Sequence, residues 1–133
     1  MSTREATYPA LEAQGFDFSV VDRALAKLEE LATKVVDLEQ HMQAVRDQGI
    51  VNATPHWRDG KYLYLIHPQK DGKRKRQYIG ANETKQQIAL CQVQNFELYH
   101  ELEQQHQHER SRYAQLASDF RITLGRVARG SRW

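Results

Sequence analysis

Cysteine is almost absent from this chain of 133 residues, in which Cys91 is the only one. A single thiol cannot form an internal disulfide, so the sequence is not a disulfide-stabilised secreted scaffold, and this usage is typical of a reducing compartment. No apolar run reaches the roughly 20 residues that a transmembrane helix needs. The first ten residues also lack the charged-then-apolar order of a secretory signal. We therefore expect a cytoplasmic protein with no membrane association.

An excess of one charge is also missing, because 19 Lys/Arg oppose 17 Asp/Glu and the net charge is only +2. The distribution along the chain is nevertheless uneven. Residues 51–80 carry seven Lys/Arg against two Asp/Glu, and residues 111–133 carry five against one, whereas residues 1–50 and 81–110 are acidic. Like charges gathered in a short stretch indicate a surface for an anionic partner better than the overall charge does.

Apolar residues recur with heptad spacing in the first third of the chain. Such a stripe is narrower than the apolar face of an ordinary surface helix and is typical of a coiled coil, whose seam must be buried against another helix. We predict a helix over residues 17–49, ending at Gly49. The partner is either the second long helix, in an antiparallel hairpin, or a second chain in a parallel dimer. We expect the hairpin, with homodimerisation in addition, through the seam residues Val21, Leu28, Leu31, Val35, Leu38, Met42 and Val45.

Residues 52–80 change from helical spacing to alternation. Asp59-Gly60 and Asp71-Gly72 are typical of tight hairpin turns, and residues 62–67 alternate in the manner of a half-buried strand. The segment therefore predicts a three-stranded antiparallel meander with a third strand over residues 73–79. If Tyr64 lies opposite Arg76, the tyrosines share one face and Leu63, Leu65 and Ile79 form the core; a slip of one residue would reverse the faces.

A second long helix is predicted over residues 82–120, with Asn82 as its N-cap. Its apolar stripe is expected to be Ile88, Cys91, Asn95, Leu98 and Leu102, which makes Cys91 a small core residue. Residues 1–16 are expected to form a flexible leader and residues 121–133 a basic tail. The fold class that follows is α+β, mainly α: two long helices forming a coiled coil or helical hairpin, joined by a small three-stranded antiparallel β-meander, in one structural domain.

Four consecutive cations, residues 73–76, lie in the meander beside several aromatic residues. Basic side chains neutralise phosphates, and aromatic faces stack on bases or sugars. The alternative is a solvated edge strand, since lysines and arginines protect sheet edges from aggregation. One or two charges would suffice for that purpose, whereas four adjacent cations repel one another. The pattern therefore favours contact with nucleic acid.

The order of these features resembles the arm-type DNA-binding domain of tyrosine integrases over residues 55–94. A Trp-led turn, an Asp-Gly pair, an aromatic strand, a second Gly turn and a basic strand ending in Tyr78-Ile79-Gly80 precede a helix. The resemblance implies a three-stranded sheet packed on one helix and inserted into the major groove. It implicates Arg58, Lys61, Tyr64, Lys73, Arg74, Lys75 and Arg76. Because a coiled coil precedes this segment and no recombinase domain follows it, the resemblance implies a stand-alone accessory binder.

The sequence thus predicts a non-enzymatic DNA-binding coiled-coil protein, an accessory factor of a mobile element in recombination, partitioning or transcription, associated with the nucleoid. RNA in place of DNA stays open, and the alternative function is a coiled-coil adaptor or inhibitor that binds an acidic protein partner. The tail supplies a possible second phosphate contact. The expected nucleic-acid-binding residues are Arg58, Lys61, Tyr64, Lys70, Lys73, Arg74, Lys75, Arg76, Arg126 and Arg129.

No cofactor is expected, and neither a catalytic arrangement nor a phosphate-binding loop is recognisable. Glu97 with His100 and Glu103 with His106 have the i, i+3 spacing of carboxylate-bridged metal sites in helical bundles. Such sites draw ligands from four helices, and the first seam offers no matching acid. We therefore interpret these pairs as a solvated helical stretch and predict no metal.

Overall fold

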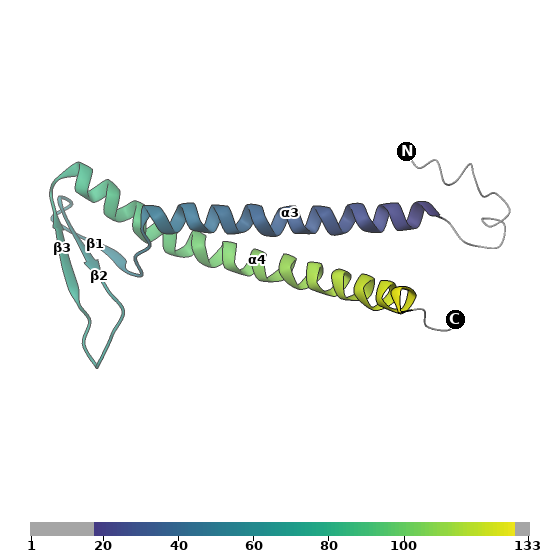
Figure 1. The fold of residues 1–133 in the computed structure, drawn as a ribbon. Coiled ribbons are helices and arrows are strands. Elements are labelled where there is room, and N and C mark those ends of the chain that lie inside the picture. The colour runs from purple at the N-terminus through teal and green to yellow at the C-terminus, as the bar shows by residue number, and fades with distance from the viewer. Residues whose placement is uncertain (1–17, 130–133) are drawn as a thin grey trace. The chain divides into compact units, whose positions relative to one another are not determined.

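The computed structural model describes residues 18–129 and contains two long helices and a three-stranded antiparallel sheet between them in the chain (Figure 1). This confirms the predicted α+β, mainly α class. The elements are α3 (Phe18–Gln48), β1 (Thr54–Arg58), β2 (Tyr62–Ile66), β3 (Arg76–Gly80) and α4 (Glu83–Ala128). The predicted leader and the last four residues of the tail lie outside the described residues. No helix within residues 18–129 is long and apolar enough to cross a membrane.

The chain divides into two compact units. The sheet unit is Leu38–Gln105 and contains the end of α3, the whole sheet and the start of α4. The helical unit joins the rest of α3 to the rest of α4, and its described residues are 18–37 and 106–129.

Helix α3 follows the heptad prediction closely. The seam residues are buried or half-buried, with Leu31 only 2% exposed. The helix ends where expected: the N–H of Gly49 donates to the carbonyl of Arg46 at 3.1 Å, and Gly49 has φ of +102°. That conformation is open to glycine at little cost, which explains why the helix stops there.

In the sheet unit the two helices run antiparallel. Met42 and Val45 of α3 pack in one core cluster with Leu102 of α4, and Asn95 donates its side-chain N–H to the carbonyl of Gly49 at 3.0 Å. The heptad seam is therefore paired within the chain here, as the hairpin alternative predicted.

The sheet has the order β1-β2-β3, and its two faces are the predicted ones. Tyr64 lies opposite Tyr78 and not opposite Arg76. Because this differs from the assumed pairing by two residues, each side chain keeps its face. A β-bulge at Leu63/Tyr64 leaves Ile79 as the extra residue of β3, and Ile79 packs against the core.

One face of the sheet packs on the first turns of α4. Leu63 and Leu65 are almost fully buried and form a core cluster with Ala89. The buried amide of Gln86 donates to the carbonyls of Lys61 (3.0 Å) and Gly80 (2.8 Å), which ties the sheet to the helix at two points. The opposite face of the sheet is consequently the one that can meet a partner.

Helix α4 corrects two predictions. Its N-cap is Asn82, whose side chain accepts the N–H of Lys85 at 3.0 Å as expected, but only Asn95 and Leu102 of the predicted stripe are buried. Ile88, Cys91 and Leu98 are exposed, because α4 turns Ala89 towards the sheet and Leu102 towards α3. The helix also continues to Ala128 and not to residue 120. A single glycine at 125 costs only about 1 kcal/mol in a helix and does not end it.

Candidate nucleic-acid interface

The hairpin that joins β2 to β3 extends beyond both strands as a narrow arm. The N–H of His67 donates to the carbonyl of Lys75 at 2.9 Å, and Lys70 and Lys73 exchange both backbone hydrogen bonds, at 3.0 and 3.1 Å. Asp71 and Gly72 form the tip with φ of +55° and +78°, the signs that a type I′ turn requires. We call residues 67–77 the basic arm. The third strand thus begins at Arg76, three residues later than predicted, because residues 73–75 lie in the arm, where only an isolated bridge between Lys70 and Lys73 and the hydrogen bond from His67 to Lys75 join its two sides.

The five cations of the basic arm are accessible to solvent. Each is exposed, and within the described part of the chain none of them forms a salt bridge. Asp71 is the only carboxylate among residues 67–77, so the arm has a strong positive charge. Cations without internal partners are available to an external anion. These residues are Lys70, Lys73, Arg74, Lys75 and Arg76.

The face of the sheet that is turned away from α4 carries an aromatic centre between arginines. Tyr64 and Tyr78 lie opposite each other with ring centroids 5.0 Å apart and an interplanar angle of 55°. Tyr78 is 58% exposed, although it stands in the middle of a strand pair. We call this surface the open face; by alternation along the paired strands it consists of Thr54, His56, Arg58, Tyr62, Tyr64, Ile66, Arg76 and Tyr78.

The predicted site residues fall into three groups. The basic arm and Arg76 lie at one end of β2. Arg58 and Lys61, both exposed, flank the first hairpin turn at the other end of β2. The two ends of β2 are about 13 Å apart, because the strand advances about 3.3 Å per residue. Arg126, in the last turn of α4, and Arg129, just after it, belong to the helical unit. Of the predicted residues, Arg58, Tyr64 and Arg76 therefore lie on the one open face, and the other arm cations continue beyond the end of β2.

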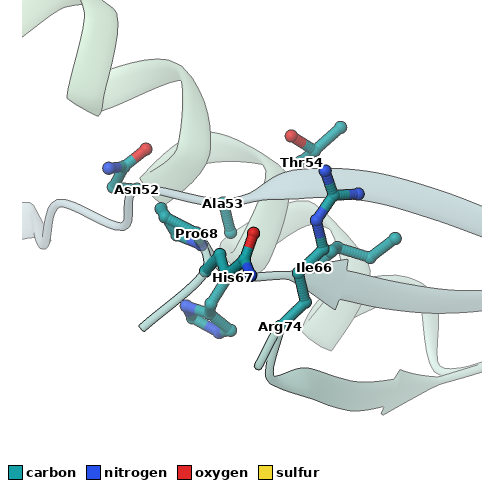
Figure 2. A pocket seen from close by; sticks show the side chains of 8 residues that line it. Asn52, Ala53, Thr54, Ile66, His67, Pro68 and Arg74 are labelled. Atoms are coloured by element: carbon teal, nitrogen blue, oxygen red, sulfur yellow. The ribbon is translucent and has the colours of Figure 1, made fainter. Parts of the chain in front are cut away.

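Two hollows adjoin the basic arm. The larger, of about 730 Å³, follows the arm itself and is lined by its cations together with His67, Pro68 and Gln77. The smaller, of about 350 Å³, lies at the base of the arm, between the segment that leads into β1 and the end of β2 (Figure 2). His67 and Pro68 line both, as does Arg74.

Some residues of this surface were not singled out from the sequence. Asn52 and Thr54 line the smaller hollow, and His56 lies on the open face opposite Tyr64. Only Trp57 and its turn were expected to matter in that segment, although Thr54 to Arg58 forms a full strand. The polar residues at alternate positions, Thr54, His56 and Arg58, could have indicated from the sequence that one side of this strand faces solvent. The hydrogen bond between His67 Nε2 and Gln77 Oε1, 2.8 Å long, joins residues ten positions apart and had no such signal.

The helical histidines form no metal centre in the described residues. His100 Nδ1 lies 3.5 Å from Glu103 Oε1, and both side chains are largely exposed. Within residues 18–129 no group of three or more His, Cys, Asp or Glu side chains could hold a metal ion.

No protein-family model, curated protein or solved structure matches this chain. Its function must therefore be argued from the surface described above.

Proposed function

We propose that this protein is a non-enzymatic DNA-binding protein that holds duplex DNA against the basic arm and the open face. The observation that carries the proposal is the set of five arm cations, all exposed and, in the described residues, all without a salt bridge. Holding like charges on a narrow hairpin is unfavourable for the free protein, and neutralisation by phosphates with release of counterions relieves it.

The open face supports the same proposal. Tyrosines and an isoleucine in the middle of a solvent-facing sheet are open to apolar and stacking contacts, and the arginines at its edges can donate to phosphates or base edges. A two-stranded ribbon is also narrow enough for the major groove, about 12 Å wide. Arm and face would then have separate tasks: the arm supplies affinity, and the face lies against the base pairs.

The biological setting is proposed on the resemblance of residues 55–94 alone: an accessory factor of a mobile element, acting in recombination, partitioning or transcription. An acidic protein surface is the competing partner. Salt dependence separates the two partners. Affinity that comes from phosphate neutralisation falls steeply as the salt concentration rises, and it does so for every DNA sequence.

The test is a charge reversal on the arm. We expect Arg74→Glu/Arg76→Glu to weaken binding of a labelled duplex by at least about a hundredfold in fluorescence anisotropy, because two phosphate contacts become two repulsions. The matched control is Lys85→Glu/Arg110→Glu, which changes the net charge equally at exposed helical positions. Lys85 is three residues after the N-cap, where a glutamate suits the helix.

The control should keep the wild-type affinity within about threefold, since it removes no proposed phosphate contact. Both variants should keep the helical circular dichroism of the wild type. Equal affinities for the arm variant and the wild type would refute the proposal for the arm.

A further inference from the structure

The smaller hollow at the base of the basic arm combines an aliphatic wall with hydrogen-bonding groups at its rim. Ile66 and Pro68 supply the apolar surface, and Asn52, Thr54 and Arg74 supply an amide, a hydroxyl and a guanidinium. In Figure 2 the Arg74 side chain extends past Ile66 towards Thr54. Apolar walls with a few polar groups are typical of small-ligand sites, and 350 Å³ lies at the small end of their range of about 300–1,000 Å³.

We propose that this hollow receives one unpaired nucleotide of a bound DNA strand. The planar base would lie against Ile66 and Pro68, with its polar edge towards Asn52 and Thr54, and its phosphate would pair with Arg74. A guanidinium is suited to phosphate, which it can bind through two parallel hydrogen bonds. The inference rests on the proposed function and specifies it further: the protein would prefer a duplex with an unpaired nucleotide to a fully paired one.

A nucleotide within a strand fits this place better than a free one, because the hollow continues into the charged surface of the arm. His67, Pro68 and Arg74 line both the smaller hollow and the hollow that follows the arm. A backbone that runs along the arm would pass Arg74, and the base of that nucleotide could enter only if it were not stacked in a duplex. Taking a base out of the stack is cheapest where it has no partner.

The walls of the hollow are held in place by backbone pairing. Thr54 lies opposite Ile66 in the β1–β2 pairing, and His67 is fixed both by its N–H, which donates to Lys75, and by its ring, which contacts Gln77. A site built on paired strands is formed before the ligand arrives, so less ordering entropy opposes binding.

The experiment compares three labelled duplexes of one sequence: fully paired, with one unpaired adenine, and with an unpaired abasic sugar at the same place. We expect the wild-type protein to bind the adenine duplex at least about tenfold more tightly than either of the others, a difference of about 1.4 kcal/mol. Placing 2-aminopurine at the unpaired position gives a second readout, since its fluorescence should change when its base enters the hollow.

The variant Asn52→Leu/Thr54→Leu fills the hollow at two exposed positions without changing charge. We expect it to bind the three duplexes with equal affinity, and so to lose the preference for the unpaired adenine. His56→Leu is the matched control, since His56 lies on the same strand but does not line the hollow. It should keep the preference.

Each of the following outcomes would overturn the inference. If the wild type bound all three duplexes equally and tightly, the hollow would not receive an unpaired nucleotide, while the proposed function would stand. A preference that survives Asn52→Leu/Thr54→Leu would place the unpaired base elsewhere. Displacement of the adenine duplex by millimolar deoxyadenosine monophosphate would assign the hollow to a free nucleotide. Failure to bind any duplex would refute the proposed function itself.

Discussion

At the scale of single residues, the clearest departure from expectation is the position of Cys91. Its apolar neighbours at helical spacing, Ile88 and Leu98, predicted a buried thiol, yet all three side chains are exposed. Among the buried residues of α4, Asn95 and Leu102 belong to the predicted stripe, whereas Gln86 and Ala89 lie in a different phase of the helix. Sequence spacing alone could not separate the two phases, because each contains both apolar and polar residues.

Because Cys91 is exposed, we predict that its thiol reacts with reagents in the folded protein. We expect its thiol to react with Ellman's reagent in the folded protein at a rate within about tenfold of that in denaturant, because accessibility governs thiol reactivity. The measurement is the rate of absorbance change with and without urea. A thiol that reacts only after unfolding would contradict the phase of α4 described here.

At the scale of the elements, the turns, the caps and the buried seam of α3 were predictable, and the packing of α4 was predictable only in part. Both Asp-Gly pairs form the expected turns, and Gly49 ends α3 as expected, because these signals act over a few residues. The basic arm lies where the run of cations and the second turn predicted a hairpin. The buried face of α4 was predictable only in part: Leu102, which packs on α3, was expected to be buried, whereas Ala89, which packs on the sheet, was not.

The pairing of α3 with α4 in the sheet unit makes a prediction about stability. Met42→Ala should lower the free energy of unfolding by about 2–5 kcal/mol, because Met42 is buried in the cluster with Val45 and Leu102. Val36→Ala is the matched control on the same helix: Val36 is 50% exposed, so its change should stay within about 0.5 kcal/mol. Urea denaturation followed by circular dichroism measures both. Similar costs for the two variants would mean that the pairing is absent in solution.

At the scale of the whole molecule, the homodimer that the heptads predicted through the seam residues stays a prediction. Met42 and Val45 pack against Leu102 of the same chain, so a second chain would have to use other residues. The helical unit offers exposed apolar side chains, among them Ile122 and Leu124. We expect light scattering at micromolar concentration to give twice the 15.5 kDa of the chain, and Ile122→Glu/Leu124→Glu to give one chain. A wild-type mass of one chain would contradict dimerisation.

The central claim, that the basic arm binds DNA phosphates, is tested most directly by the salt dependence of duplex affinity. Each phosphate contact contributes a slope of about −0.9 to the plot of log K against log salt concentration. If the five arm cations bind phosphates, the wild-type slope should be about −4.5, and neutralising two of them in Arg74→Gln/Arg76→Gln should reduce its magnitude by about 2. A wild-type slope near zero, or one that this variant leaves unchanged, would contradict the claim.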